Sequence, residues 1–409
     1  ETATRYLTAA QEGPVAMEVA DVAQPNFAEP YLTPFGTSIE RLTESFHSNH
    51  TYSQLQAVSY DSRYILLSED VPTESSAKDV VRRLEDGFPE VIASPIGVWG
   101  NPRWHPGQAA VLVHFDSNTD EVLRWQETDP ATGETLTVFT FPPEYQRYLK
   151  NQSFDELSRD GRFVAGQAVG VGDWSRIFSL DLTSMALAAE IDPAALYAGP
   201  CTEDPEFGPL DPDWVGVSPL GNYLIVQWAA AGPGRCEGLE SYDIETGAYV
   251  GHVADGHPHA DMTVLADGTT EVFVTNELFG PAVGESFVGG EPAGVEDRSN
   301  PALAYRELPG PATGESAVHY LYSIDYGGFE HISCRGPQGF CLVTGYPSPE
   351  NGARDPLEDE IYLIQLDGGG VTRLAHHHSS GADYYSQPRA TFSADGRYVS
   401  FLKSNANNV

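Results

Sequence analysis

The sequence predicts an all-β protein, a seven-bladed β-propeller. A turn of the form Ser-x-Asp-Gly recurs along the chain, and each copy is followed by an alternating apolar segment typical of a β-strand. A third strand and another turn follow in several copies. No stretch shows long helical periodicity, although residues 80–85 and 192–197 could form short helices.

The repeated turn occurs seven times and defines the blades in order. Asp and Gly tolerate the conformations that reverse a strand, and Ser or Asp side chains bond nearby backbone amides. Dividing 409 residues by seven gives about 58 residues per copy, enough for the three to four short strands of a blade. The turns are Ser59-Tyr-Asp-Ser, His105-Pro-Gly, Ser158-Arg-Asp-Gly, Ser218-Pro-Leu-Gly, Leu265-Ala-Asp-Gly, Gly336-Pro-Gln-Gly and Ser393-Ala-Asp-Gly.

We expect a single domain over residues 1–409, closed into a ring by its N-terminal segment. Thr37-Ser-Ile-Glu-Arg-Leu-Thr43 looks like Gly370-Val-Thr-Arg-Leu374, an outer strand. Residues 1–45 are therefore predicted to supply the missing outer strands of the last blade, which would remove an open sheet edge. A disordered tail over residues 1–36 is the alternative. Residues 276–316, rich in Gly, Pro and Glu, are predicted to form a long insertion loop.

The charge balance excludes several classes of protein. The chain has 22 Lys plus Arg against 59 Asp plus Glu, a net charge of −37. So few cations cannot neutralise a phosphate backbone, which excludes a nucleic-acid partner, and electrostatic binding to acidic lipid is excluded on the same ground. No run of 18 apolar residues exists, so no membrane span is predicted. An acidic surface is typical of a secreted protein in salty, marine water, where salt screens self-repulsion.

The four cysteines fall into two local pairs, Cys201 with Cys236 and Cys334 with Cys341. We predict two short-loop disulfides, and four buried free thiols are the alternative. Disulfides indicate an oxidising compartment, so the protein is expected to be secreted, either extracellular or periplasmic.

The last blade carries a family resemblance. Ile361-Tyr-Leu-Ile-Gln-Leu-Asp-Gly-Gly-Gly, Thr372-Arg-Leu and then Ser393-Ala-Asp-Gly-Arg-Tyr resemble the TolB-type family of secreted and periplasmic propellers. The resemblance is strongest between Ile361 and Leu402. It implies the propeller fold and the secreted location, and implies little about activity.

Polar side chains precede every repeated turn, where the innermost strand of each blade should line the central channel. These side chains should converge and form a site at the channel mouth. We expect Asn101, Arg103, Gln54, Trp214 and Tyr385 to contact a substrate. The segments are Gln54–Gln56, Asn101–His105, Asp155–Glu156, Asp213–Trp214, His257–Asp261, His331–Ser333 and Gln387–Arg389.

His257, His259 and Asp261 form the most metal-like group. Residues i and i+2 of a strand point the same way, so the three would share one face. Two imidazoles and a carboxylate suit a divalent ion such as zinc or manganese, with calcium a further candidate, and no organic cofactor is expected. In the alternative reading, only one of them points inward and bonds a neighbouring blade. His331, at the equivalent place in the next blade, could complete the metal set or act as a general base.

Arg389 is unusual because an inner strand is a poor place for a guanidinium, which there needs an anionic partner. That partner is either a protein carboxylate, such as Asp261 or Asp213, or a substrate carboxylate. Arg103 raises the same question. A run of three histidines, His376 to His378, precedes Tyr384 and Tyr385, and at least one of these side chains is expected to reach the mouth.

Gln387 and the histidines near it resemble the last blade of oligogalacturonate lyases. That resemblance implies a polysaccharide lyase that cleaves an acidic, uronate-containing polysaccharide or oligosaccharide by β-elimination. Gln387, His331 and His259 would belong to the metal set. Asp261 is added to this set because the strand pattern places it on the same face as His259. Arg389 would neutralise the uronate carboxylate, His331 or His257 would be the base, and Tyr384 the acid. The family's Gln-x-x-His-x-His is missing after Gln387.

Two other functions remain open from the sequence. One is a non-catalytic propeller that binds a glycan or a protein. The other is a glycoside hydrolase with paired carboxylates drawn from Asp155, Asp213 and Asp261, which should then lie about 5–9 Å apart. We expect the protein to be a monomer in each case.

Overall fold

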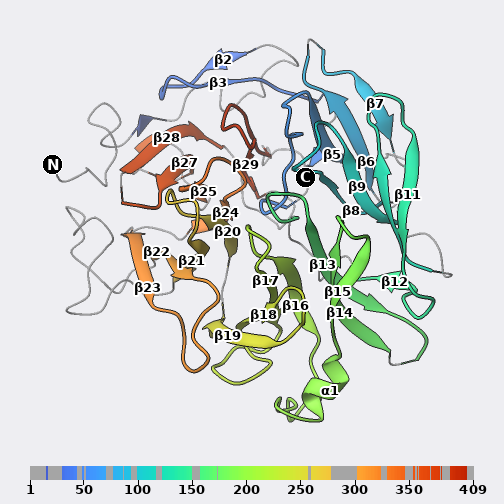
Figure 1. Cartoon of the computed structure of the whole chain (residues 1–409). Coiled ribbons are helices and arrows are strands. Elements are labelled where there is room, and N and C mark those ends of the chain that lie inside the picture. Colours follow the sequence, from blue (N-terminus) through green and yellow to red (C-terminus); the bar gives the residue numbers. More distant parts are fainter. Residues whose placement is uncertain are drawn as a thin grey trace.

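A computed structural model of the chain contains six four-stranded antiparallel sheets arranged around a central axis (Figure 1). The structure describes all of the chain except residues 1–14, 17–29, 44–47, 50–51, 71–76, 86, 94–98, 117–121, 150–156, 173, 257–258, 278–301, 324–328, 346–352, 355–356, 358, 369, 378, 380–386 and 403–409.

Each sheet is a blade whose strands follow one another in the sequence. Blade one contains β4 (Ser48–Asn49), β5 (Tyr64–Asp70), β6 (Ala77–Arg83) and β7 (Glu90–Ala93). Blade two contains β8 (Trp99–Trp104), β9 (Leu112–Asp116), β10 (Arg124–Thr128) and β11 (Thr135–Thr140). Blade three contains β12 (Arg147–Tyr148), β13 (Phe163–Val169), β14 (Ser175–Asp181) and β15 (Ala186–Ile191).

The second half of the ring follows the same plan with one interruption. Blade four contains β16 (Pro212–Val217), β17 (Tyr223–Trp228), β18 (Leu239–Asp243) and β19 (Tyr249–Ala254). Blade five contains β20 (Ala260–Val264), β21 (Glu271–Glu277), β22 (Ala302–Glu307) and β23 (Val318–Ser323). Blade six contains β24 (Phe329–Ser333), β25 (Phe340–Gly345), β27 (Glu360–Gln365) and β28 (Gly370–His376), because the intervening β26 (Ala353–Arg354) pairs instead with β1 (Val15–Ala16).

The count of seven blades predicted from the turns is wrong. The seventh copy of the turn forms only a two-stranded hairpin, β29 (Thr391–Phe392) and β30 (Val399–Ser400), which lies between blade six and blade one (Figure 1). Ser333 of blade six bonds Thr391 at 3.0 Å, and Ser62 of blade one bonds Asp395 at 2.9 Å. A repeated turn predicts a hairpin, whereas a blade needs further strands to pair with it.

The expected closure of the last blade by N-terminal strands is also not seen in the described part of the chain. β3 (Ser38–Ile39) pairs with β2 (Tyr31–Leu32), and neither pairs with β30. The β2–β3 hairpin instead lies against β28, where the hydroxyls of Thr33 and Thr37 both donate to the carbonyl of Leu374.

The repeated turns are built as the sequence predicts. In the Ser158 turn the Ser hydroxyl donates to Asp160 at 2.6 Å and accepts the amide of Phe163 at 2.9 Å. Gly161 has φ +74°, a left-handed conformation that glycine adopts without steric cost. The Ser59 and Ser393 turns repeat the Ser–Asp bond at 2.7 and 2.6 Å.

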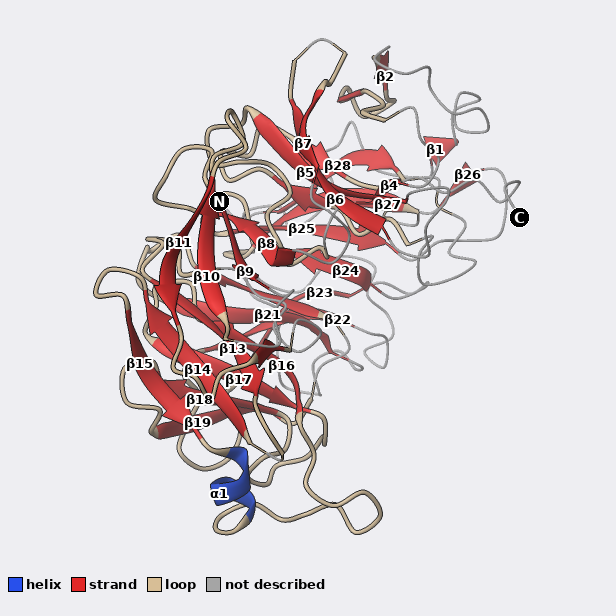
Figure 2. Ribbon diagram, turned by 90° about the vertical axis from the view of Figure 1, so that its right-hand side faces the viewer, coloured by secondary structure: helices blue, strands red, loops and turns tan. Residues whose placement is uncertain are grey.

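Several local expectations can be compared with the observed elements. Residues 193–197 form the helix α1 (Pro193–Tyr197), capped by Asp192 and projecting from the ring, whereas residues 80–85 belong mostly to strand β6 (Figure 2). The predicted insertion loop over residues 276–316 is shorter than expected, because β22 falls inside it.

Apolar clusters fill the spaces within and between neighbouring blades, such as the one that joins Phe115 and Trp125 of blade two to Phe178 of blade three. Both predicted disulfides are present, Cys201–Cys236 and Cys334–Cys341. Among the described residues, no helix has the length and apolar character needed to cross a membrane.

Candidate functional site

Four side chains from four parts of the ring meet at its centre. We call Tyr52, His259, His331 and Arg389 the histidine cluster. The imidazoles of His259 and His331 stack with their centroids 4.6 Å apart and their planes at 23°. Tyr52 meets His331 edge-on at 5.2 Å, and the guanidinium of Arg389 lies over the Tyr52 ring at 5.4 Å. The cluster therefore combines two imidazoles, a phenol and a cation.

The adjoining strands hold the two histidines in place. His259 directly precedes β20, its amide donates to the side chain of Asn276 at 3.1 Å, and its carbonyl accepts the Thr275 hydroxyl at 3.0 Å. His331 lies within β24 and is 1% exposed. His259 keeps partial access to solvent, so it is the more accessible of the two imidazoles.

The backbone at Arg389 is strained. Its φ is +43°, a left-handed value that a long side chain rarely adopts and that costs about 1–3 kcal/mol. The side chain is nevertheless 5% exposed. Strain of this kind persists where the surrounding structure imposes it, and it is common at functional sites.

The cluster favours a neutral imidazole. Burial lowers the pKa of His259, and the positive charge of Arg389 lowers that pKa further. At neutral pH His259 is therefore uncharged and able to accept a proton, while Arg389 remains a cation.

Asp261 is not placed as a metal ligand. Its carboxylate is ion-paired with Arg335, and it also accepts the amides of Met262 at 2.7 Å and Cys334 at 2.5 Å. Among the described residues, no three His, Cys, Asp or Glu side chains are grouped to hold an ion. The expected set of His259, Asp261, Gln387 and His331 thus does not fit a metal: its carboxylate is engaged, and the Arg389 charge acts on His259.

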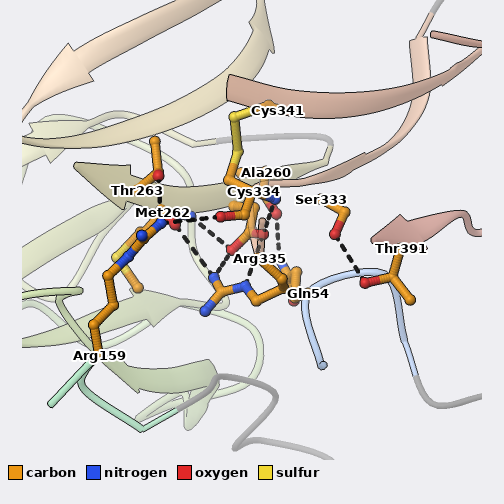
Figure 3. Close-up of a disulfide and its surroundings, with 11 residues drawn as sticks. Gln54, Arg159, Ala260, Met262, Thr263, Ser333, Cys334, Arg335, Cys341 and Thr391 are labelled. Carbon is orange, nitrogen blue, oxygen red and sulfur yellow. Dashed lines mark hydrogen bonds and ion pairs between the residues drawn. A yellow bond between two sulfur atoms is a disulfide. The ribbon is translucent and has the colours of Figure 1, made fainter. Parts of the chain in front are cut away.

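Gln54 and Gln387 lie near the centre in different roles. The side chain of Gln54 donates to the carbonyl of Ala260, so it ties blade one to the inner strand of blade five (Figure 3). Gln387 is partly buried, and its Oε1 has no hydrogen-bond partner within the described part of the chain. That oxygen is available as an acceptor two residues before Arg389.

Three other residues expected at the site have local roles. Trp214 is 7% exposed and packs with Ile225, Val253 and Met262, so the structure places it in the core where blades four and five meet. Arg103 is 1% exposed, and its guanidinium donates to the carbonyl of Asn101 at 2.9 Å.

Two histidines of the run from His376 to His378 lie in the described part of the chain, at the end of β28. His376 and His377 are both fully buried. His377 bonds the carbonyl of Gly345 at 3.2 Å and accepts the amide of Ser379 at 3.0 Å, whereas His376 lies 3.6 Å from the Glu360 carboxylate. The remaining candidates, His257, His378, Tyr384, Tyr385, Asp155 and Glu156, lie outside the described residues.

The sequence did not single out Tyr52, Arg335 or Arg159. Tyr52 lies two residues before a segment chosen for its polarity, and Arg335 directly follows a predicted disulfide cysteine. Arg159 occupies the second position of its turn, where other copies carry Pro219, Ala266 or Ala394. The remaining copies carry Tyr60, Pro106 and Pro337, so Arg159 is the one charged residue at this position, a signal that the repeat alignment contained.

Comparisons with known proteins place the chain among β-propellers. No protein-family model and no curated protein sequence matches it. Oligogalacturonate lyase from Vibrio parahaemolyticus is similar in structure, with a TM-score of 0.57 and 12% identity over 93% of this chain and 94% of that chain. An oligogalacturonate lyase in complex with manganese gives the same TM-score and identity over 93% of each chain. TolB from Acinetobacter baumannii, at 15% identity over 77% of this chain and 64% of that chain, has a TM-score of only 0.38. The two likenesses to oligogalacturonate lyases show the propeller fold and no particular family.

Proposed function

We propose that the protein is a lyase that cleaves uronate-containing oligosaccharides or polysaccharides by β-elimination. The observation that carries the proposal is the histidine cluster, which sets a neutral imidazole, a phenol and a cation together at the centre of the propeller. β-Elimination next to a carboxylate requires a base, an acid and a positive charge.

Arg389 supplies the charge. A uronate carboxylate bound to its guanidinium loses much of its negative charge, so the neighbouring C5 proton becomes more acidic. The guanidinium is almost fully buried and the low-dielectric surroundings strengthen this interaction.

His259 is the base and Tyr52 the acid. The neutral imidazole of His259 takes the C5 proton, the electron pair forms the C4–C5 double bond, and the C4–O4 bond breaks. Tyr52 gives its proton to the departing O4, and Arg389 over the phenol ring stabilises the resulting phenolate. His331 stacks on His259 and orients it. Gln387 accepts a hydrogen bond from a sugar hydroxyl.

The likeness to oligogalacturonate lyases guides the choice of substrate. At 12% identity it concerns the fold, so it supports an acidic sugar as the first substrate class to examine and no more than that. The two disulfides are compatible with a secreted or periplasmic location, where such substrates occur.

A glycoside hydrolase is less well supported. Of its two described candidate carboxylates, Asp261 is held by Arg335 and two backbone amides. Asp213, the other described candidate, is exposed to solvent, although partial burial raises its pKa.

The experiment is incubation of the protein with a panel of uronate oligosaccharides and polysaccharides, followed by the ultraviolet absorbance of the unsaturated product. We expect absorbance to rise with at least one uronate and to persist after treatment with a chelator, since no step requires a metal. Reducing-end release without absorbance would indicate the hydrolase. Binding without any product would indicate the non-catalytic propeller.

The acid is tested by replacing Tyr52 with Phe, which keeps the ring and removes the proton. We expect a loss of about 10²–10⁴-fold in kcat. The matched control is Tyr398→Phe, because Tyr398 also lies beneath a guanidinium, that of Arg397 at 5.6 Å, but in the surface turn of β29–β30. Equal activity of the two variants would remove Tyr52 from the mechanism.

A further inference from the structure

A second polar group lies at the end of the ring where the repeated turns are. Arg159, in the turn of blade three, reaches the inner strand of blade five and the end of the inner strand of blade six. Its Nη2 donates to the hydroxyl of Thr263 at 2.8 Å and to the carbonyl of Cys334 at 3.3 Å (Figure 3). Its guanidinium therefore lies between blades that are not neighbours of its own.

This group is separate from the histidine cluster. His259 precedes β20 and Thr263 lies near its other end, so four residues of extended strand, about 13 Å, separate the two. The Cys334–Cys341 disulfide anchors the backbone on which Arg159 rests (Figure 3).

Arg159 is a cation without a carboxylate partner among the described residues. Asp261 pairs with Arg335, the other guanidinium of this group, and not with Arg159. The carboxylates of the nearby turns are engaged in their own turns, Asp160 with the hydroxyl of Ser158 and Asp61 with that of Ser59.

This arrangement makes the charged form of Arg159 less stable. Burial and the repulsion from Arg335 lower its pKa to about 10, so it is still protonated at neutral pH. Its Nε and Nη1 make no hydrogen bond to the described part of the chain. A partly buried cation with open donors is stabilised by an anion that fills them.

We propose that Arg159 and Arg335, beside the hydroxyl of Thr263, bind a small oxyanion at the turn end of the channel: a carboxylate, sulfate or phosphate group. This site goes beyond the proposed lyase function and does not depend on it. The N–H groups at Nε and Nη1 of Arg159 bind the anion oxygens, and the positive charge of Arg335 adds to the attraction. The two guanidinium groups of Arg159 and Arg335 would attract an anion, although the net charge of the whole chain is −37.

The test is calorimetric titration of the whole protein with acetate, sulfate and phosphate in separate runs at matched ionic strength. Saturable binding of at least one anion with one site per chain is expected. Binding of acetate alone would identify a carboxylate ligand, and binding of sulfate or phosphate a tetrahedral one. Absence of saturable binding for all three anions would overturn the proposal.

Arg159→Gln should weaken binding at least tenfold. The matched control is Arg162→Gln in the same turn, whose guanidinium pairs with Asp181 and Glu245 at the surface and should leave the affinity unchanged. Acetate bound by Arg389 should be lost in Arg389→Gln, whereas anion binding at Arg159 should remain in that variant, which separates this site from the histidine cluster. Wild-type affinity in Arg159→Gln would contradict the assignment.

If Arg159→Gln does not fold, Arg159→Lys tests the same point. Lysine keeps the charge but has only one nitrogen for the acceptors of Thr263 and Cys334 and for the anion. We expect a folded protein with weaker anion binding. Unchanged affinity would show that the anion binds elsewhere.

Discussion

At the scale of single residues, His259 shows how a neighbouring charge sets the chemistry of the centre. Two causes lower its pKa, burial first and the charge of Arg389 second. Together they keep the imidazole neutral below the usual value of 6.5, so the base form persists into mildly acidic solution.

This pKa is measurable without any substrate, by following the imidazole protons of His259 by NMR as the pH changes. We expect a midpoint below 6.5 in the wild type and a higher midpoint in Arg389→Gln, because that variant removes one of the two causes. The control is His105, whose pKa is lowered mainly by burial with no contribution from Arg389, so its midpoint should be the same in both proteins. An unchanged His259 midpoint would show that the charge of Arg389 does not affect the pKa of this imidazole.

His377 makes the protein sensitive to acid. Its pKa is lowered to about 3, because the fully buried ring is costly to charge. It bonds Gly345 through one nitrogen and accepts the amide of Ser379 at the other, so the neutral ring is satisfied on both sides. In the unfolded chain the same ring titrates near 6.5, so between these two values the unfolded state binds more protons.

The contribution of His377 to stability is therefore complete above pH 6.5 and decreases as the pH falls toward 3. Between pH 6.5 and 5 we expect the wild type to lose about 2 kcal/mol of unfolding free energy through this residue. His377→Gln should lose less over the same interval in denaturant unfolding, even if it is less stable at pH 7. Identical pH slopes would show that His377 carries no such linkage.

The sequence located part of the site for a clear reason. His259, His331 and Arg389 precede turns that recur in register, so the repeat alone brings them to the channel. The engagement of Asp261 by Arg335 could not be predicted, because the ion pair joins residues 74 positions apart through side-chain geometry. Tyr52 lies in a loop whose path the strand pattern does not define.

At the scale of the elements, turn chemistry was the most dependable signal. In the three turns that carry Ser-x-Asp, the Ser hydroxyl bonds the Asp carboxylate, so this pair of residues gives the same local bond in three different blades of the repeat. By contrast, residues 80–83 form strand and not helix, because pairing of β6 with β5 and β7 overrides a weak local preference.

The two disulfides differ in the length of chain that they close. Cys201–Cys236 spans 35 residues and Cys334–Cys341 spans 7. From loop entropy, replacing each pair by Ala should cost about 3.8 and about 2.4 kcal/mol, respectively. Denaturant unfolding of the two double variants measures this order. A larger loss from the shorter loop would show that Cys334 acts mainly by holding its contacts with Asp261 and Arg159.

At the scale of the whole molecule, the number of blades is the feature that the repeated turns did not predict correctly. Seven turns were recognised, and all seven regions fold as strand pairs around the ring, but only six acquire four strands. The number of strands in a sheet depends on long-range pairing, as in the choice of β3 to pair with β2. The repeated turns do not indicate which strand pairs with β3.

The net charge of the molecule is negative, whereas the charged side chain at its centre, Arg389, is positive. The chain carries −37 in total, whereas Arg389 lies beside the neutral imidazole of His259 at the centre, and Arg159 and Arg335 lie at the end of the ring where the turns are. An acidic substrate is thus repelled by the shell and attracted by the centre.

The difference in sign between the surface charge and the central charge predicts that added salt strengthens the binding of an acidic oligosaccharide. Raising the ionic strength from 0.01 to 0.15 M shortens the Debye length from about 30 to about 8 Å, which screens the shell more than the buried centre. We expect KM for an acidic oligosaccharide to fall over this range, in initial-rate measurements at fixed pH. A steady rise of KM would mean that the exposed cations govern binding.

The central claim is that Arg389 and His259 act directly on a uronate. It is tested by kcat/KM for Arg389→Lys and His259→Ala against their surface controls Arg397→Lys and His319→Ala, with the most active uronate of the panel as substrate. We expect the two central variants to lose at least about 10²-fold and the two controls to stay near the wild type. Wild-type activity in either central variant, or silence of the wild type on every uronate, would contradict the account.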